Sequence, residues 1–253
     1  MQKPRLDGNG VPILSHEGIE LRTEKLLEVL APTCLSEIVG TPIAAIAEKL
    51  SRERGLIIVP QASLGSIGGR KIRGCCDINS GTVYVDDCLE PGSAKFNFTL
   101  AHEIGHFLMH RNVLPSALNA ESDPLIKDID RDLVFNQLES DNPRSLIEWQ
   151  ANKFASSILL PRKIFPKAVI FVQKELGVSR NIGKVYLNAR NDPDYKNLVD
   201  ALSLIYRVSS SVLRIRMQEL NILVDKTSFF RQESAVKTAN EALTDLFNSW
   251  GLE

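Results

Sequence analysis

Two histidines and a glutamate in one short segment are the residues of this chain best suited to chemistry. His102 and His106 are four positions apart, and Glu103 directly follows the first of them. On a helix, residues four apart lie one above the other, so both imidazoles can reach one metal ion. The Glu103 carboxylate then lies beside the open position of that ion, where it can accept a proton from water. The spacing therefore predicts a zinc site that hydrolyses peptide bonds.

A simpler interpretation is that both histidines are ordinary core or surface residues. Apolar residues recur around them at helical spacing, which predicts a helix packed in a core. These residues are Leu100, Ala101, Ile104, Phe107 and Leu108. Imidazoles on a buried helix lose their water and need new partners. One shared metal ion supplies a partner for both, so the metal site is the favoured interpretation.

A catalytic zinc ion takes three protein ligands and leaves a further position to water, so a third ligand is needed. The segment between Pro143 and Pro161 predicts a second helix. One face of it carries Glu148, Ala151, Asn152, Ala155 and Leu159. A carboxylate on such an apolar face needs a cation, which makes Glu148 the expected ligand, with an exposed helix glutamate as the alternative. Asn152 is expected to hydrogen-bond a ligand imidazole.

Three stretches of the chain resemble the ImmA/IrrE family of zinc metallopeptidases. Residues 98–106 are similar to the family's FTLAHELGH block, and residues 148–161 to its ExxANxFAxxLLMP block. A weaker similarity covers residues 202–220. The resemblance implies three ligands for one Zn²⁺ ion, namely His102, His106 and Glu148. It also implies Glu103 as the general base.

The resemblance implies a function as well. Family members look like endopeptidases that cut helix-turn-helix repressors at one site and thereby switch on genes, so a repressor protein is the expected substrate and partner. The alternative is a regulatory or sensor protein that contains zinc and binds a transcription factor without cutting it. A closed, four-ligand metal site would favour this alternative. A third class is a DNA-binding factor built on the carboxyl-terminal helices.

The expected fold class is α+β, with a zincin-like core in which a small sheet with an edge hairpin packs on the two ligand helices. Residues 1–165 are the predicted metallopeptidase domain. Residues 166–253 are predicted to form a helical region, with a helix-turn-helix or a packing role for the pair at 198–222. Further helices are predicted over residues 19–30, 42–54 and 163–176.

Strand patterns precede the histidine helix. Residues 56–59 predict a buried strand, and the glycine-rich residues 65–74 predict a mobile turn. Residues 75–79 and 82–86 predict a hairpin around Ser80 and Gly81. Zinc peptidases commonly hold substrate against an edge strand, so residues 82–85 are the expected substrate rail, with a purely structural hairpin as the alternative.

The sequence leaves alternatives for the roles of two segments and for the identity of one catalytic group. The acidic insert at 118–142 is interpreted as a lid, a substrate loop or a solvated surface insertion. Apolar residues beyond 225 predict local packing or a helix that docks on a partner. An oxyanion donor is also required, and the chemically able side chains are Tyr84, Tyr186, Tyr195, Tyr206 and His110. His110 is alternatively a core residue or a support for a ligand.

Composition indicates an ordinary enzyme-sized chain. The 253 residues are 43% hydrophobic, carry a formal net charge of -1 and have a pI near 6.5, which offers no global attraction for nucleic acid or an anionic membrane. No apolar run has the length of a membrane span, and the first residues lack a secretion signal, so the cytoplasm is the expected compartment. The four cysteines, at 34, 75, 76 and 88, are expected to be reduced thiols, with redox sensing as the alternative. No pattern indicates an oligomeric state.

Overall fold

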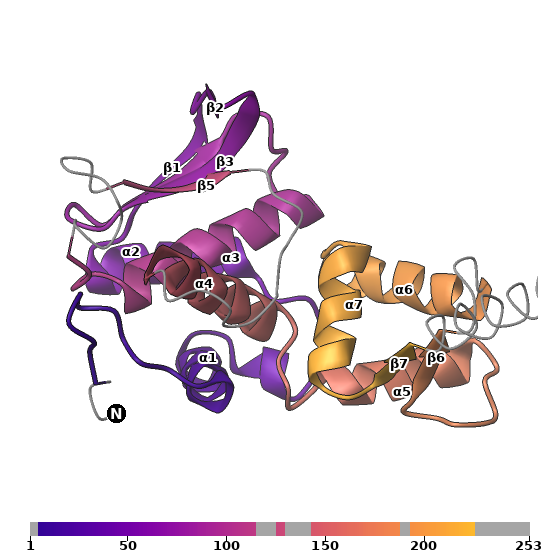
Figure 1. Ribbon diagram of the computed structural model, residues 1–253. Helices are drawn as coiled ribbons and strands as arrows, with labels where there is room; N and C mark the ends of the chain where they lie inside the picture. The colour runs from indigo at the N-terminus through magenta and orange to yellow at the C-terminus, as the bar shows by residue number, and fades with distance from the viewer. Residues whose placement is uncertain (1–4, 115–124, 130–142, 188–192, 226–253) are drawn as a thin grey trace, which may run out of the picture.

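The structure is a computed structural model that describes residues 5–114, 125–129, 143–187 and 193–225 (Figure 1). Within these ranges the chain forms seven α-helices, a five-stranded sheet and a two-stranded sheet. The predicted α+β class is therefore confirmed. Most of the predicted insert at 118–142 and the apolar residues beyond 225 lie outside the described residues.

The amino-terminal part supplies two helices with clear start and stop signals. α1 (His16–Leu30) begins at Ser15, whose hydroxyl accepts a hydrogen bond from the Gly18 amide. A short 3₁₀ helix, η1 (Pro32–Leu35), follows. α2 (Ile43–Arg54) ends at Gly55, which takes the left-handed conformation at φ 71°. Both predicted helices are confirmed, and α1 begins three residues earlier than its apolar pattern indicated.

The main sheet has the order β1-β4-β3-β2, and β5 also pairs with β3. β1 (Ile57–Ala62) runs parallel to β4 (Thr82–Asp86), whereas β3 (Arg70–Asp77) is antiparallel to β4. The short β2 (Ser66–Ile67) and β5 (Leu125–Ile129) both pair with β3 in antiparallel fashion. One part of the predicted insert is therefore a sheet strand.

Strand order corrects the expectation of a substrate rail at residues 82–85. The predicted hairpin exists, with Asp77 opposite Thr82. Its second strand, β4, is hydrogen-bonded on both sides, to β1 and to β3, and has no free edge to offer a substrate.

The strand predicted over residues 56–59 exists as β1, but its predicted burial was wrong, and so was the mobile turn predicted over residues 65–74. Residues 56–59 were expected to form a buried strand, but β1 is an outer strand of the sheet and Ile57 is 52% exposed. Residues 65–74 were expected to form a mobile turn. Instead, Ser66 pairs with Lys71 and Ile67 with Arg70, so most of this segment is a hairpin with Gly68 and Gly69 at its tip.

The two helices that carry the chemistry lie side by side beneath the sheet in Figure 1, with α1 below them. α3 (Ala94–Met109) starts at Ser93, whose hydroxyl accepts from the Phe96 amide. α4 (Pro143–Leu159) packs along it. Gly105 permits the close approach, since a Cβ there would lie 3.1 Å from Phe154 of α4. Ala151 and Ala155 are fully buried, as expected of small residues between two helices.

The carboxyl-terminal part comprises α5 (Phe165–Glu175), α6 (Pro193–Tyr206) and α7 (Ser210–Glu219), drawn in orange tones in Figure 1. The short strands β6 (Val185–Leu187) and β7 (Leu223–Asp225) pair in parallel beside them. The predicted helix pair is confirmed. The division of the chain after residue 165 stays a prediction.

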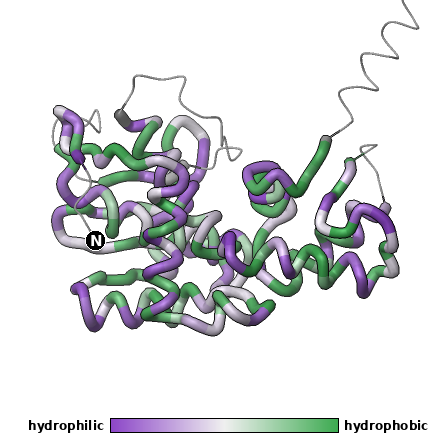
Figure 2. The backbone as a smooth tube through the Cα atoms, turned by 90° about the horizontal axis from the view of Figure 1, so that it is seen from below, coloured by the Kyte–Doolittle hydropathy of each residue, from purple (hydrophilic) through white to green (hydrophobic). Residues whose placement is uncertain are grey.

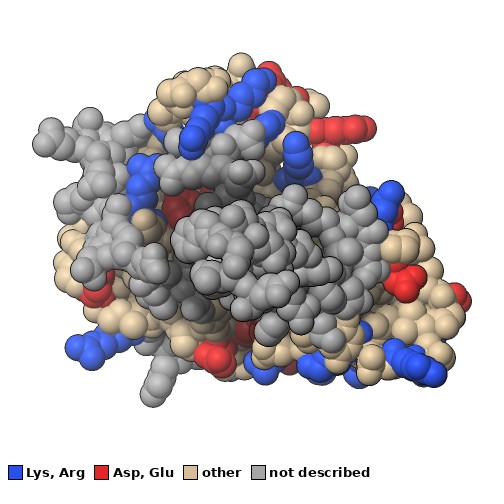
Figure 3. Space-filling model, turned by 45° about the vertical axis from the view of Figure 1, so that its right-hand side comes forward, with Lys and Arg blue, Asp and Glu red and all other residues tan. Residues whose placement is uncertain are grey.

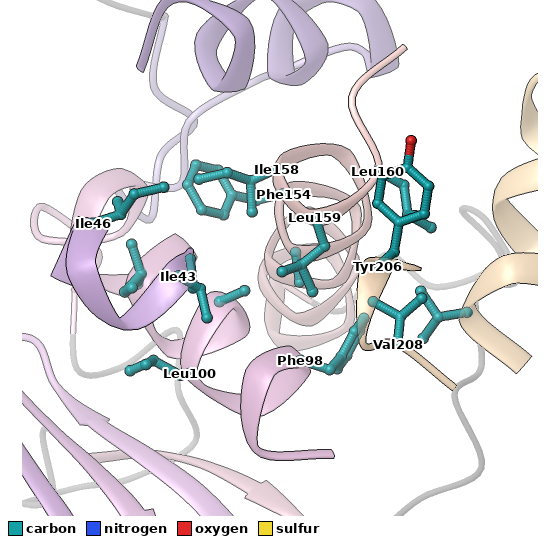
Figure 4. Packing of buried hydrophobic residues seen from close by; sticks show 14 of the residues in the cluster. Ile43, Ile46, Phe98, Leu100, Phe154, Ile158, Leu159, Leu160, Tyr206 and Val208 are labelled. Atoms are coloured by element: carbon teal, nitrogen blue, oxygen red, sulfur yellow. The ribbon is translucent and has the colours of Figure 1, made fainter. Parts of the chain in front are cut away.

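One hydrophobic cluster extends through both parts of the chain. Figure 4 shows it where α2, α3 and α4 meet the end of α6, with Ile43, Phe98, Leu159 and Tyr206 among the labelled side chains. The tube in Figure 2 shows the same principle along the helices, where hydrophobic and hydrophilic stretches alternate as on amphipathic helices.

A charged cluster is buried beside this core. Glu20 of α1 accepts hydrogen bonds from Lys153 of α4 and from Arg216 of α7, at 2.8 Å for both Lys153 Nζ and Arg216 Nη2. Glu219 accepts from the same two cations at 2.7 and 3.0 Å. Arg216 Nε also donates to the Leu160 carbonyl at 2.9 Å. The cluster, Glu20, Lys153, Arg216 and Glu219, therefore joins three helices that are distant in sequence.

The described surface carries charges of both signs. In Figure 3, Lys and Arg side chains stand near Asp and Glu side chains on the described part of the visible face. No helix among the described residues is long and apolar enough to cross a membrane. All four cysteines are free thiols, and Cys88 alone among them is exposed.

Candidate metal centre

The side chains of His102, His106 and Glu148 meet between α3 and α4. His102 Nε2 lies 2.9 Å from His106 Nε2. Glu148 Oε2 lies 3.3 Å from His102 Nε2 and 3.8 Å from His106 Nε2. One potential ligand atom from each residue falls within 4.8 Å of the others, so this cluster could hold a metal ion. It contains the three residues that the sequence singled out.

The far nitrogen of His102 has the partner that the sequence predicted. His102 Nδ1 lies 2.9 Å from Asn152 Oδ1, one helical turn beyond Glu148 on α4. An amide oxygen only accepts hydrogen bonds, so the ring proton of neutral His102 resides on Nδ1. Its Nε2 lone pair then points toward Glu148 and His106.

His106 is oriented by a longer series of hydrogen bonds. His106 Nδ1 lies 2.9 Å from His110 Nδ1, and His110 Nε2 lies 2.9 Å from Gln150 Oε1. The Gln150 amide nitrogen donates to the Pro12 carbonyl oxygen at 2.6 Å. We call His106, His110, Gln150 and the Pro12 carbonyl the polar relay.

The polar relay determines where the His106 proton lies. A carbonyl cannot donate, so the Gln150 nitrogen faces Pro12 and its oxygen faces His110. His110 therefore carries its proton on Nε2 and accepts at Nδ1. His106 must then donate from Nδ1, which leaves a lone pair on its Nε2.

Burial keeps these imidazoles neutral. Loss of water around the fully buried ring lowers the pKa of His106, and burial together with the neighbouring His106 lowers the pKa of His110 to about 3. Burial alone would raise the pKa of Glu148, but the adjacent imidazoles of His102 and His106 outweigh it and hold that pKa below 4.5. Near neutral pH the site thus presents a neutral His106 imidazole and the Glu148 carboxylate.

The arrangement fits a cation. Two Nε2 lone pairs only 2.9 Å apart repel each other, and Glu148 adds negative charge beside them. Glu148 Oε1 is buried and has no hydrogen-bond partner among the described residues. A divalent ion bound here would remove the repulsion between the lone pairs and would give the buried Glu148 oxygen a partner. Two histidines with one carboxylate suit zinc. The Glu148 side chain is 24% exposed, whereas both histidines are buried.

Glu103 is fully buried under β3. The backbone of Gly74 lies so close that a Cβ there would come within 3.0 Å of Glu103 Cδ and 2.7 Å of Thr99 Cγ2. Only a residue without a side chain leaves room for the carboxylate at this place. Glu103 thus has a fixed position one residue from His102.

The sequence missed Gln150 and Gly74 as supports of the centre. Gln150 lies two positions after Glu148, off the face that carries the other inward groups, and no pattern links it to Pro12. His110 was left open as an oxyanion donor, yet both of its ring nitrogens are engaged in the polar relay, which excludes that use in this arrangement. The four tyrosines stay untested in that role.

Comparison with known families matches residues 62–182 to the peptidase M78 family model, described as the IrrE N-terminal-like domain. This span includes α3, α4 and the whole His102, His106 and Glu148 cluster. A search of curated proteins found no match.

Among solved structures, a Mycobacterium tuberculosis transcriptional regulator is similar at 16% identity and a TM-score of 0.46. The alignment covers 81% of this chain and 56% of that one, so the present chain spans little more than half the length of the regulator.

Proposed function

We propose that the protein is a zinc-dependent endopeptidase, because residues 62–182 match the peptidase M78 family model, the IrrE N-terminal-like domain. In this proposal His102, His106 and Glu148 hold the ion, and Glu103 is the general base. The observation that carries the proposal is the convergence of two Nε2 lone pairs on the Glu148 carboxylate, in a cluster of three ligand residues among those that the structure describes. A structural zinc site, in contrast, is closed by four protein ligands.

The chemistry divides between the ion and the chain. A bound zinc ion polarises a carbonyl and lowers the pKa of water from about 16 to about 7. Glu103 takes one proton from the attacking water and returns it to the nitrogen of the leaving amine. Gly74 leaves the room that the Glu103 carboxylate occupies. Asn152 and the polar relay hold the two imidazoles in the ligating orientation.

For the substrate we propose a helix-turn-helix repressor, cut at one site. Support for this finer statement comes from the resemblance of residues 98–106, 148–161 and 202–220 to the ImmA/IrrE family. The near-neutral net charge of -1 agrees with a protein substrate better than with a nucleic acid.

The test compares the wild-type protein with Glu103→Gln. Both proteins, loaded with zinc, are incubated with a panel of purified helix-turn-helix repressors, and the fragments are identified by mass spectrometry. We expect one cut in one repressor with wild type and at least a roughly 100-fold slower cut with the variant, while zinc content stays equal. Equal zinc content without any difference in fragments would point instead to a regulator that binds its partner without cutting it.

A further inference from the structure

We propose that the amino-terminal segment, residues 5–14, is a positioning element of the metal centre that selects the ligating form of His106 through His110 and Gln150. The inference rests on the proposed metal centre. The two histidines are supported differently: His102 takes its orientation directly from Asn152 of α4, whereas His106 depends on a relay that ends outside α3 and α4.

The direction of the relay depends on the Pro12 carbonyl. His110 and Gln150 are fully buried and Pro12 is buried, so water does not readily replace a lost partner. Without that carbonyl, no other hydrogen bond within the described part of the chain distinguishes the oxygen from the nitrogen of the Gln150 amide. A flipped amide would donate to His110 Nε2, His110 would donate from Nδ1, and His106 would have to accept at Nδ1. The His106 proton would then sit on Nε2, where the ion should bind.

The segment itself is built to hold Pro12 in place. The Asp7 carboxylate accepts from the amides of Asn9 and Val11, both at 2.8 Å, and an isolated bridge pairs Leu6 with Pro12. Val11 is fully buried in the core.

The same segment is attached to the chain just after α3. The Leu114 amide donates to the Asn9 carbonyl at 2.9 Å. Gly10 has a φ of 77° and lies against the Asn112 carbonyl, where any Cβ would collide with backbone. Side chains at position 10 therefore displace the segment, whereas Gly8 has nothing within 4 Å of its Cβ position.

This difference provides a matched pair of variants, Gly10→Ala and Gly8→Ala. Zinc affinity is measured by competition with a chromophoric chelator. We expect Gly10→Ala to bind zinc about 10-fold more weakly or worse, as is typical when an outer support of a ligand is lost, and Gly8→Ala to bind like wild type.

A second set tests the relay itself. His110→Leu and Gln150→Leu should lose about 10- to 100-fold in zinc affinity. His110→Asn should retain most of it, because the Asn oxygen can accept from His106 near the position of the imidazole Nδ1. Gln173→Leu is the control: Gln173 is also a buried amide with two backbone partners, Lys184 and Gly183, but it lies outside the relay. It should lose stability without losing zinc affinity.

Nitrogen-15 NMR of histidine-labelled, metal-free protein tests the proton position without any metal. Wild type should show the His106 proton on Nδ1, and Gly10→Ala and Gln150→Leu should shift part of the population to Nε2. Unchanged tautomers in both variants would overturn the inference, as would wild-type zinc affinity in Gly10→Ala and His110→Leu. A protein that binds zinc and follows these tautomers but cuts nothing would refute the proposed peptidase and leave the inference standing.

Discussion

Gly74 of β3 lies directly against the carboxylate of Glu103 on α3, in a space that no larger residue can share. A strand residue with no side chain thus defines the position of the proposed general base. This contact links the sheet to the reaction, although β4 itself has no free edge.

The first prediction follows from that contact. Gly74→Ala should displace the Glu103 carboxylate and lower kcat by about 100-fold or more, since a general base contributes on that order. Zinc content should stay at the wild-type level, because the atoms nearest to a Cβ at position 74 belong to Glu103 and Thr99, which are not proposed ligands. Peptide hydrolysis and elemental analysis of the same sample check both statements. Gly8→Ala is the control, and a fully active Gly74→Ala enzyme would show that Glu103 is not the base.

The second prediction concerns the third ligand. Wild type should contain near-stoichiometric zinc, and Glu148→Ala should lose it, because two imidazoles alone leave the ion short of a ligand. Addition of a chelator should lower the Tm of wild type but leave the Tm of Glu148→Ala unchanged, because only a metal that binds the folded state stabilises it. Glu175→Ala, an exposed change on α5, controls for removal of a carboxylate. Full zinc content in Glu148→Ala would remove this residue from the site.

The third prediction concerns the packing of α3 on α4. Gly105→Ala should destabilise the fold by about 1–3 kcal/mol, the usual cost of an added methyl in a tight core, because Phe154 would have to move. Gly18→Ala, whose Cβ would lie 3.5 Å from the Ser15 hydroxyl, should change stability little. Urea unfolding measures both. Equal stability of the two variants would contradict the close helix contact.

The fourth prediction is a pH dependence that arises at Glu20. Burial would raise the pKa of Glu20, but hydrogen bonds and charge from Arg216 and Lys153 outweigh it and lower the pKa to about 2, from 4.5. This carboxylate therefore contributes stability in full above pH 4.5, and that contribution is lost as the pH falls toward 2. The size is about 3 kcal/mol from the shift alone.

Glu20→Gln tests this pH dependence. At pH 6 it should cost about 3–5 kcal/mol, since it leaves buried cations short of a partner. The difference from wild type should shrink in unfolding experiments repeated near pH 3. Glu28→Gln, an exposed change on the same helix, is the control. A cost that is the same at both pH values would show that Glu20 does not titrate in this range.

Local sequence patterns predicted the residues of the site more accurately than they predicted the arrangement of the sheet. The i, i+4 spacing of His102 and His106 and the inward face of Glu148 and Asn152 depend only on helix geometry, and the structure brings all four together. Strand order depends on pairing between distant segments. An apolar run such as Ile57 to Val59 fits an outer strand as well as a buried one. No feature of this short segment indicates that β1 pairs with β4 along the edge of the sheet.

Buried polar residues were the other gap. Gln150 is fully buried because α4 meets Pro12 of the amino-terminal segment on a side that the apolar pattern left unassigned. Lys153 and Arg216 are usually surface residue types, and only their partners on other helices explain why they are inside.

The charged cluster also has a consequence for the order of synthesis. The Arg216 and Glu20 side chains meet across 196 positions of the chain, and Lys153 receives its second carboxylate from Glu219. A ribosome therefore completes both ligand helices well before the last charges beside α4 emerge. A nascent chain that ends short of α7 holds Lys153 with Glu20 alone and leaves the Leu160 carbonyl without its guanidinium donor. We expect such stalled chains to be more sensitive to an added protease around α4 than chains that extend past residue 219, so the surroundings of α4 are complete only after α7 has been translated.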